Sequence, residues 1–298
     1  MEQIDLCGTG VALVTPFNED LTVDFQSLGK VIDHVISGGA DYLVVMGTTG
    51  ESVTLNKDEK KHIVQYIIEK NNKRLPMVLG IGGNNTLEVT ESINSTDLSA
   101  FGAVLSVSPY YNKPNQEGIY QHYKFIAENT NAPLILYNVP GRTGKNIEAK
   151  TTLRLANDFN NIIAIKEASG DMAQAMKILK DKPKNFKIIS GDDALTLPIM
   201  AMGGCGVISV IANAFTVQFS KMVNYAISGN ITEARKLHYT VFEMIGMLFE
   251  EGSPSGIKAA LNRIGLCKDF VRLPLVPVSK SLNERIVSLT EKLNVQMK

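Results

Sequence analysis

A lysine lies at the end of an apolar run, where its amine could act as a nucleophile. Lys166 directly follows the run at residues 162–165, which is typical of a strand buried on both faces. Burial disfavours the charged ammonium, and a neutral amine can attack a carbonyl carbon to form an imine. The alternative is a strand-end lysine whose head group extends into solvent. Position alone leaves both interpretations open.

Hydroxyl groups follow other apolar runs of the same kind. Tyr137 ends the preceding run, and Thr48 and Tyr111 follow two further runs. A phenol that is hydrogen-bonded to other hydroxyls can carry protons to and from a reacting group. Tyr137 could instead be a core aromatic residue, and Thr48 and Thr49 could serve only the turn before a helix. A carboxylate could bind there, because Gly50 leaves backbone N–H groups beside the two threonine hydroxyls.

Other polar residues favour simpler interpretations. Asp192 and Asp193 could form an acid–base pair, but they precede a predicted helix, and we interpret them as caps. The histidines and cysteines are widely spaced, whereas a zinc site usually needs close groups of such ligands. We therefore predict neither a metal nor a cofactor. The dispersed residues are His34, His62, His122, His238, Cys7, Cys205 and Cys267.

Eight short apolar runs alternate with longer segments of helical spacing, which predicts an α/β fold of the (β/α)8 barrel type. In such a barrel the active site lies at the C-terminal ends of the strands, where Lys166 and the hydroxyl groups stand. The runs are residues 10–14, 42–46, 77–81, 103–107, 134–137, 162–165, 186–189 and 206–210.

A doubly wound open sheet is the alternative fold, but its nucleotide-binding patterns are incomplete here. The segment 80–85 lacks the last glycine of the dinucleotide fingerprint. A phosphate loop at 139–146 would have Val139 in place of its first glycine and Asn146 in place of its Ser or Thr. The barrel therefore remains the better prediction.

After Gly229 the alternation ends, and three helices without intervening strands are predicted at residues 231–250, 255–264 and 281–295. We predict a catalytic barrel over residues 1–229 and a small helical domain over residues 230–298. Lys plus Arg and Asp plus Glu each number 30, and this balance argues against nucleic-acid or membrane-surface partners. With no signal-like or membrane-spanning run, we expect a cytoplasmic protein.

Five motifs together resemble the dihydrodipicolinate synthase family, in order and spacing over nearly the whole chain. The resemblance implies that pyruvate forms an imine and then an enamine on Lys166. The enamine would attack L-aspartate 4-semialdehyde, giving 4-hydroxy-tetrahydrodipicolinate in lysine and diaminopimelate biosynthesis. The motifs are Gly47-Thr48-Thr49-Gly50-Glu51, Pro109-Tyr110-Tyr111-Asn112, Tyr137-Asn138-Val139-Pro140-Gly141-Arg142-Thr143, Lys166-Glu167 and Gly206-Val207-Ile208-Ser209.

The resemblance also implies roles for the hydroxyl residues. Tyr137 would carry protons and would be linked through Thr48 to Tyr111. In the family, the tyrosine that matches Tyr111 reaches into a neighbouring subunit's site, within a homotetramer of tight dimers. The resemblance therefore implies that the active protein is a homo-oligomer.

Substrate-binding roles follow from the same resemblance. Thr48 and Thr49 would hold the carboxylate of pyruvate. Arg142 would pair with the carboxylate of the semialdehyde, which suits a planar bidentate donor. Gly191 and the backbone of Ile208 would border the pocket.

Some members of the family bind L-lysine as an inhibitor at a dimer contact. Lys57 and Lys60 stand where sensitive bacterial enzymes carry histidines, and their charge opposes a cationic ligand. We therefore predict weak or absent inhibition by L-lysine. The positions of the possible effector site are Asn84, Glu88, Tyr110 and Ser52.

Two other functions remain as alternatives. An N-acetylneuraminate lyase or a keto-deoxy sugar acid aldolase would share the lysine and the tyrosine, although Arg142 favours the synthase. A catalytically silent binding protein could have the same fold, but the set of Lys166, Tyr137, Thr48 and Tyr111 argues against it. Borohydride trapping separates an enzyme from a binder, and a panel of aldehydes separates synthase from lyase.

Overall fold

The computed structural model describes residues 4–295, and within them eight parallel strands form a closed barrel in chain order. The (β/α)8 fold predicted from the sequence is confirmed. The strands are β1 (Gly8–Ala12), β2 (Tyr42–Val45), β3 (Met77–Gly80), β4 (Ala103–Val107), β5 (Leu134–Asn138), β6 (Ile162–Glu167), β7 (Lys187–Ser190) and β8 (Gly206–Ser209).

Helices connect the strands, and further helices follow β8. Those up to α9 are α1 (Phe25–Ser37), α2 (Lys57–Asn71), α3 (Thr86–Ser95), α4 (Gln116–Glu128), α5 (Pro140–Thr143), α6 (Ala149–Asp158), α7 (Met172–Asp181), α8 (Thr196–Ala201) and α9 (Thr216–Ile227). The last are α10 (Ile231–Glu250), α11 (Ser255–Arg263) and α12 (Lys280–Val295). Short 3-10 turns are η1 (Thr48–Gly50), η2 (Ser52–Thr54) and η3 (Ile211–Asn213). No helix within residues 4–295 is long and apolar enough to cross a membrane.

Side-chain caps set the starts of several helices. Asn56 and Glu59 form a reciprocal capping box at α2, with two side chain-to-backbone hydrogen bonds of 2.9 Å each. The Asp171 carboxylate accepts from the Gln174 N–H at the start of α7. Asp192 accepts from the Ala194 and Leu195 N–H groups in the turn before α8, but the N-cap of α8 is Leu195, which makes no side-chain cap hydrogen bond, so the interpretation of Asp192 as the helix cap is wrong.

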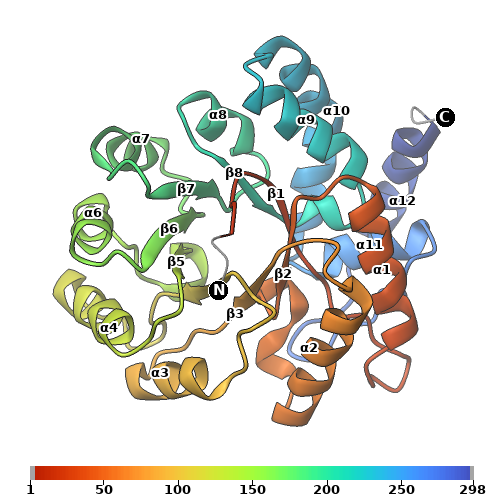
Figure 1. The fold of residues 1–298 in the computed structure, drawn as a ribbon. Coiled ribbons are helices and arrows are strands. Elements are labelled where there is room, and N and C mark those ends of the chain that lie inside the picture. Colours follow the sequence, from red (N-terminus) through yellow and green to blue (C-terminus); the bar gives the residue numbers. More distant parts are fainter. Residues whose placement is uncertain (1–3, 296–298) are drawn as a thin grey trace. The chain divides into compact units, whose positions relative to one another are not determined.

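Contacts divide the chain into two compact units. The first comprises Met1–Cys7 and Pro76–Ile208, and the second comprises Gly8–Leu75 and Ser209–Lys298. This division does not coincide with the domain boundary predicted at residue 229, which stays a prediction. In the first unit, α3, α4, α6 and α7 lie outside strands β3 to β7 (Figure 1). A continuous apolar core fills the space between these strands and helices, and it includes Val104, Leu136, Ile165 and Ile188.

Candidate active site

The structure brings Lys166 and Tyr137 together at the C-terminal ends of β6 and β5. The two residues are paired in the strand register. The Lys166 Nζ atom lies 4.3 Å from the centroid of the Tyr137 ring, within reach of a cation–π contact. Lys166 is 6% exposed and Tyr137 is 7% exposed, so the amine lies in a largely dry environment beside a phenol.

A β-bulge in β6 aims Lys166 at this position. Leu134 pairs with Ile162, but the next residue, Ile135, pairs with Ala164, so Ile163 is the extra residue. Leu134 and Ile162 both belong to the core between the strands and the helices. Strict alternation from Ile162 would also send Lys166 to the helix side, and the bulge reverses this. Lys166 therefore faces the barrel interior because of an irregularity that the sequence analysis did not foresee.

Gly191 borders the lysine. A Cβ atom at Gly191 would lie 3.1 Å from both Cγ and Cε of Lys166 and 2.6 Å from Cβ of Ala168. The absence of a side chain at the end of β7 therefore leaves the space that the lysine stem occupies. Ile208, on β8, is 1% exposed.

Arg142 lies in α5, the short helix directly after β5, with Thr143 buried beside it. The backbone N–H of Arg142 donates to the Val139 carbonyl at 2.9 Å. The Arg142 side chain is exposed, so its guanidinium is accessible to an anion.

The structure adds a buried polar pair that the sequence analysis missed. Asn138 and Glu167 follow Tyr137 and Lys166 in the same register, and Glu167 is 3% exposed. Both oxygens of the Glu167 carboxylate accept from the Asn138 amide, at 3.1 and 3.0 Å. The available signal was the charge of Glu167, one position after the inward-facing Lys166. Alternation along a strand places such a residue among the helices, where a buried charge needs hydrogen-bond partners.

In the second unit, Thr48 and Thr49 lie in η1, with Thr48 exposed and Thr49 buried. The residue after this turn, Glu51, has a left-handed backbone with φ of 52°. The turn itself is held by a hydrogen bond of 2.7 Å from the Thr15 hydroxyl to the Gly50 carbonyl. The predicted carboxylate-binding residues are therefore on a backbone that is fixed from within its own unit.

An ion pair anchors the same loop to the C-terminal helices of the second unit. The Lys258 Nζ atom in α11 lies 2.5 Å from a Glu51 carboxylate oxygen, and both side chains are almost fully buried. The other Glu51 oxygen accepts from the Arg272 N–H at 2.9 Å. Burial lowers the pKa of Lys258, although the Glu51 carboxylate opposes that shift. This pair could not be foreseen from the sequence, because Glu51 lies in the loop after β2 and Lys258 lies in α11.

The residues of the predicted effector site fall in both units. In the first unit, the Asn84 side chain donates to the Tyr110 carbonyl at 3.1 Å, and Glu88 lies exposed in the first turn of α3. Ser52 belongs to the second unit, in η2. Tyr111 has a positive φ of 71° and is 89% exposed in the isolated chain.

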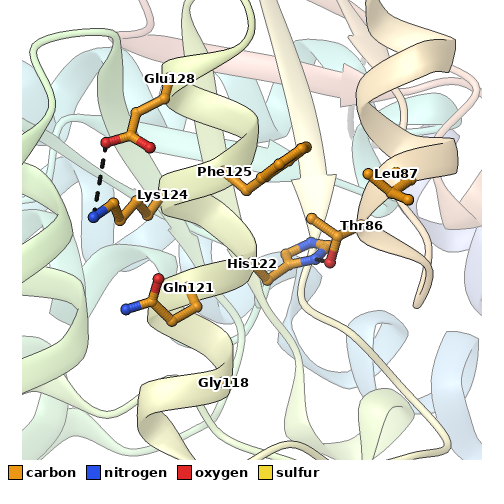
Figure 2. A pocket seen from close by; sticks show the side chains of 8 residues that line it. All are labelled: Thr86, Leu87, Gly118, Gln121, His122, Lys124, Phe125 and Glu128. Atoms are coloured by element: carbon orange, nitrogen blue, oxygen red, sulfur yellow. Dashed lines mark hydrogen bonds and ion pairs between the residues drawn. The ribbon is translucent and has the colours of Figure 1, made fainter.

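A separate hollow of about 340 Å³ lies between α3 and α4 (Figure 2). Within it, the His122 Nδ1 atom lies 2.9 Å from the Thr86 hydroxyl oxygen, and burial lowers the pKa of His122 to about 4. This histidine is therefore neutral at neutral pH and packs between α3 and α4. None of the predicted site residues lines this hollow, whose walls are Thr86, Leu87, Gly118, Gln121, His122, Lys124, Phe125 and Glu128.

A (β/α)8 barrel with a buried lysine beside a tyrosine at adjacent strand ends defines a class of enzyme, the class I aldolases that work through a Schiff base. Comparisons with known proteins narrow this class to one family. Residues 5–293 match the model of the dihydrodipicolinate synthetase family, and the chain belongs to that family.

Several relatives align with almost the whole chain. The chain is 54% identical to the 4-hydroxy-tetrahydrodipicolinate synthase of Flavobacterium psychrophilum, over 96% of this chain and 98% of that one. It is also similar to a dihydrodipicolinate synthase of Acinetobacter baumannii in complex with pyruvate, with a TM-score of 0.94, 38% identity and coverage of 98% and 100%. A third relative is the enzyme of Cyanidioschyzon merolae with lysine bound, with a TM-score of 0.92, 34% identity and coverage of 97% and 98%.

These relatives confirm the enzyme class and the function predicted from the sequence. The chain is an aldolase-type lyase of lysine and diaminopimelate biosynthesis. The roles of individual residues remain predictions.

Proposed function

We propose that Lys166 is the nucleophile with which this chain condenses pyruvate and L-aspartate 4-semialdehyde. The observation that carries the proposal is the position of its amine, buried at a strand end and 4.3 Å from the Tyr137 ring centroid. The amine of a lysine can attack a carbonyl carbon and form an imine. The neighbouring phenol provides a group that can exchange protons with the reacting atoms.

The proposed reaction conserves atoms and charge at each step. The Lys166 amine adds to the keto carbon of pyruvate, and the adduct takes up one proton and loses water to give a protonated imine. The iminium withdraws electrons, so a methyl proton leaves and an enamine forms. The enamine carbon attacks the aldehyde carbon of the second substrate, and the aldehyde oxygen takes up a proton. Cyclisation through the amino group of the semialdehyde then releases the lysine.

Tyr137 is proposed to carry the protons of these steps, and Thr48 and Tyr111 are proposed to complete its relay. Thr48 and Thr49 are proposed to bind the carboxylate of pyruvate through their hydroxyl and backbone N–H groups. The fixed backbone of η1 supports this role, because it needs no reordering when the anion binds.

Arg142 is proposed to bind the carboxylate of the semialdehyde, since its exposed guanidinium can form two parallel hydrogen bonds with an anion. Gly191 and Ile208 are proposed to form the pocket wall. For Gly191 the support is direct, because any side chain there would meet the Lys166 stem.

We further propose that the protein acts in the cytoplasm as a homotetramer of tight dimers. Tyr111, at 89% exposed, is available to a second copy of the chain, as the family resemblance implies. The three cysteines, Cys7, Cys205 and Cys267, are free thiols, which suits a reducing compartment.

Borohydride trapping tests the proposed nucleophile. Pyruvate and borohydride together should add one reduced pyruvate unit to Lys166, detected by peptide mass. Lys166→Ala should lose the label, whereas the control Lys187→Ala, which alters a lysine on the adjacent strand β7, should keep it. Labelling of a different lysine would refute the proposal. With the imine formed, turnover of aspartate semialdehyde but not N-acetylmannosamine would separate the synthase from the lyase alternative.

A further inference from the structure

We propose that Asn138 and Glu167 are positioning residues that fix the register in which Lys166 faces Tyr137. The inference rests on the proposed role of Lys166. Asn138 and Glu167 come one residue after Tyr137 and Lys166, and they form the next matched pair between β5 and β6. Because neighbouring strand residues point to opposite faces, the first pair faces the barrel interior and the second pair faces the helices.

The Glu167 carboxylate is buried and held by neutral donors. It accepts from the Asn138 amide on both oxygens, from the Ser169 N–H at 2.7 Å and from the Gln174 amide at 3.0 Å. A buried carboxylate is costly unless its lone pairs are satisfied, so this arrangement strongly favours one geometry. Glu167 therefore penalises any strand pairing that moves it away from Asn138 and Gln174.

Asn138 is itself fixed by the segment that precedes α6. Its side-chain oxygen accepts from the Ile147 N–H at 2.9 Å, and its amide also donates to the Asn146 oxygen at 2.7 Å. The Asn146 amide in turn donates to the Gln174 oxygen at 2.7 Å. Four side chains thus connect β5, β6, α7 and the loop before α6 in one hydrogen-bonded network.

The neighbouring bulge explains why β6 needs residues that fix its pairing register with β5. The four residues before Lys166, at positions 162–165, are all apolar. They therefore bury a similar apolar surface with or without a bulge at Ile163. A slip of one residue would turn Lys166 towards the helices and Glu167 towards the barrel interior. Only the observed register gives Glu167 its four hydrogen bonds from Asn138, Ser169 and Gln174. The polar pair therefore supplies the specificity that the apolar run lacks.

A charge exchange between the two residues tests the proposal. Asn138→Asp alone sets two carboxylates against each other, and Glu167→Gln alone sets two amides against each other. Each single variant should slow trapping of the pyruvate imine by about 10-fold or more, because small misplacements of reacting groups have large kinetic effects. The double variant Asn138→Asp, Glu167→Gln again sets one carboxylate opposite one amide. On a logarithmic scale, it should recover at least about a third of the loss in the rate of imine formation.

The measurements separate positioning from general stability. Imine formation is followed by borohydride quench and intact mass, well below the melting temperature of each variant, and kcat and KM for pyruvate are measured in parallel. A positioning role lowers kcat more than it raises KM. The matched control is Asn161→Asp, because Asn161 makes hydrogen bonds to the Ala127 and Thr130 carbonyls at the opposite end of β6. It should lower the melting temperature without slowing imine formation.

Each outcome decides the proposal. Wild-type rates in both single variants, or a folded double variant no faster than the single ones, would overturn it. If the single variants do not fold, Gln174→Met is measured instead; it removes one donor from Glu167 and should slow imine formation by about three-fold, and an unchanged rate would refute the positioning role. Absence of label in the wild-type protein would instead refute the role of Lys166, which keeps the two failures distinct.

Discussion

At Gly191, the missing side chain determines how much space the proposed nucleophile Lys166 has. Gly191→Ala would place a methyl group 3.1 Å from two carbons of the Lys166 stem and 2.6 Å from the Ala168 Cβ atom. Since the lysine must shift, we expect imine formation with pyruvate to fall by about 100-fold. Mass spectrometry of the borohydride-trapped protein over time measures this rate.

Gly246→Ala is the control for that substitution. Gly246 lies inside α10, and a Cβ atom there would meet nothing within 4 Å. The control should keep wild-type activity and gain slightly in stability, because alanine favours the helix. Equal rates for Gly191→Ala and the wild-type protein would show that the lysine stem can move aside freely.

The two side chains proposed to react could be singled out from the sequence, whereas the residues that surround them were harder to find. Lys166 and Tyr137 end apolar runs, and strand ends are where a barrel holds its chemistry. For Asn138 and Glu167 the charge one position beyond Lys166 was the one available signal, because their partners lie on segments that only the fold brings close. Gly191 was named only through the family resemblance, because its residue type alone does not distinguish it from a turn glycine.

Among the elements, the loop after β2 depends on a charge in α11. Lys258→Met removes the only ammonium bonded to the Glu51 carboxylate within the described residues and leaves the Arg272 N–H as its donor. Removal of one partner of a buried ion pair costs about 3–5 kcal/mol. We therefore expect a clearly lower melting temperature and, because Glu51 follows η1, a higher KM for pyruvate.

A second variant separates these two effects. Adding Glu51→Gln to Lys258→Met removes the uncompensated charge while the Gln oxygen can still accept from the Arg272 N–H. The melting temperature should rise again, but KM should stay high, since the loop is no longer tied to α11. Full recovery of KM would mean that the ion pair affects stability alone.

The positions of the strands and helices were largely evident from the sequence. All eight apolar runs overlap observed strands, and the helix predicted at residues 231–250 matches α10 from end to end. The first run was placed two residues late, because β1 begins at Gly8 and its Gly-Thr-Gly start looks like a turn. The bulge at Ile163 was not predictable, since a run of four apolar residues gives no indication of alternation.

For the whole molecule, we expect the active unit to be at least a dimer. Tyr111 is 89% exposed in one chain, so its proposed relay role requires a second chain to cover it. Mixing inactive Tyr111→Phe and Lys166→Ala proteins under subunit exchange should therefore restore part of the activity, because some sites then combine an intact lysine with an intact tyrosine. No recovery, with exchange shown by native mass spectrometry, would place the complete site within one chain.

Inhibition by L-lysine is also a question for the whole molecule, because the family's effector site lies at a dimer contact. We predict weak or absent inhibition of this protein. Glu88 can attract the ligand's ammonium, but Lys57 and Lys60 add two positive charges to the set of positions that the family uses. A titration of the initial rate with L-lysine should show little inhibition at about 1 mM. Inhibition well below that concentration, which corresponds to binding stronger than roughly −4 kcal/mol, would contradict the prediction. Replacing both lysines by histidine should increase sensitivity.

The ion pair between Glu51 and Lys258 joins residues 207 positions apart, and this separation has a consequence during translation. Domains form as the ribosome delivers the chain from its N-terminus, so Lys166 and the η1 loop emerge well before α11. Until Lys258 emerges, the Glu51 carboxylate has no ammonium to bury against and keeps its water. A nascent chain thus contains its proposed nucleophile long before the loop proposed to bind pyruvate is anchored, and we expect competence to bind substrate only once synthesis has passed α11.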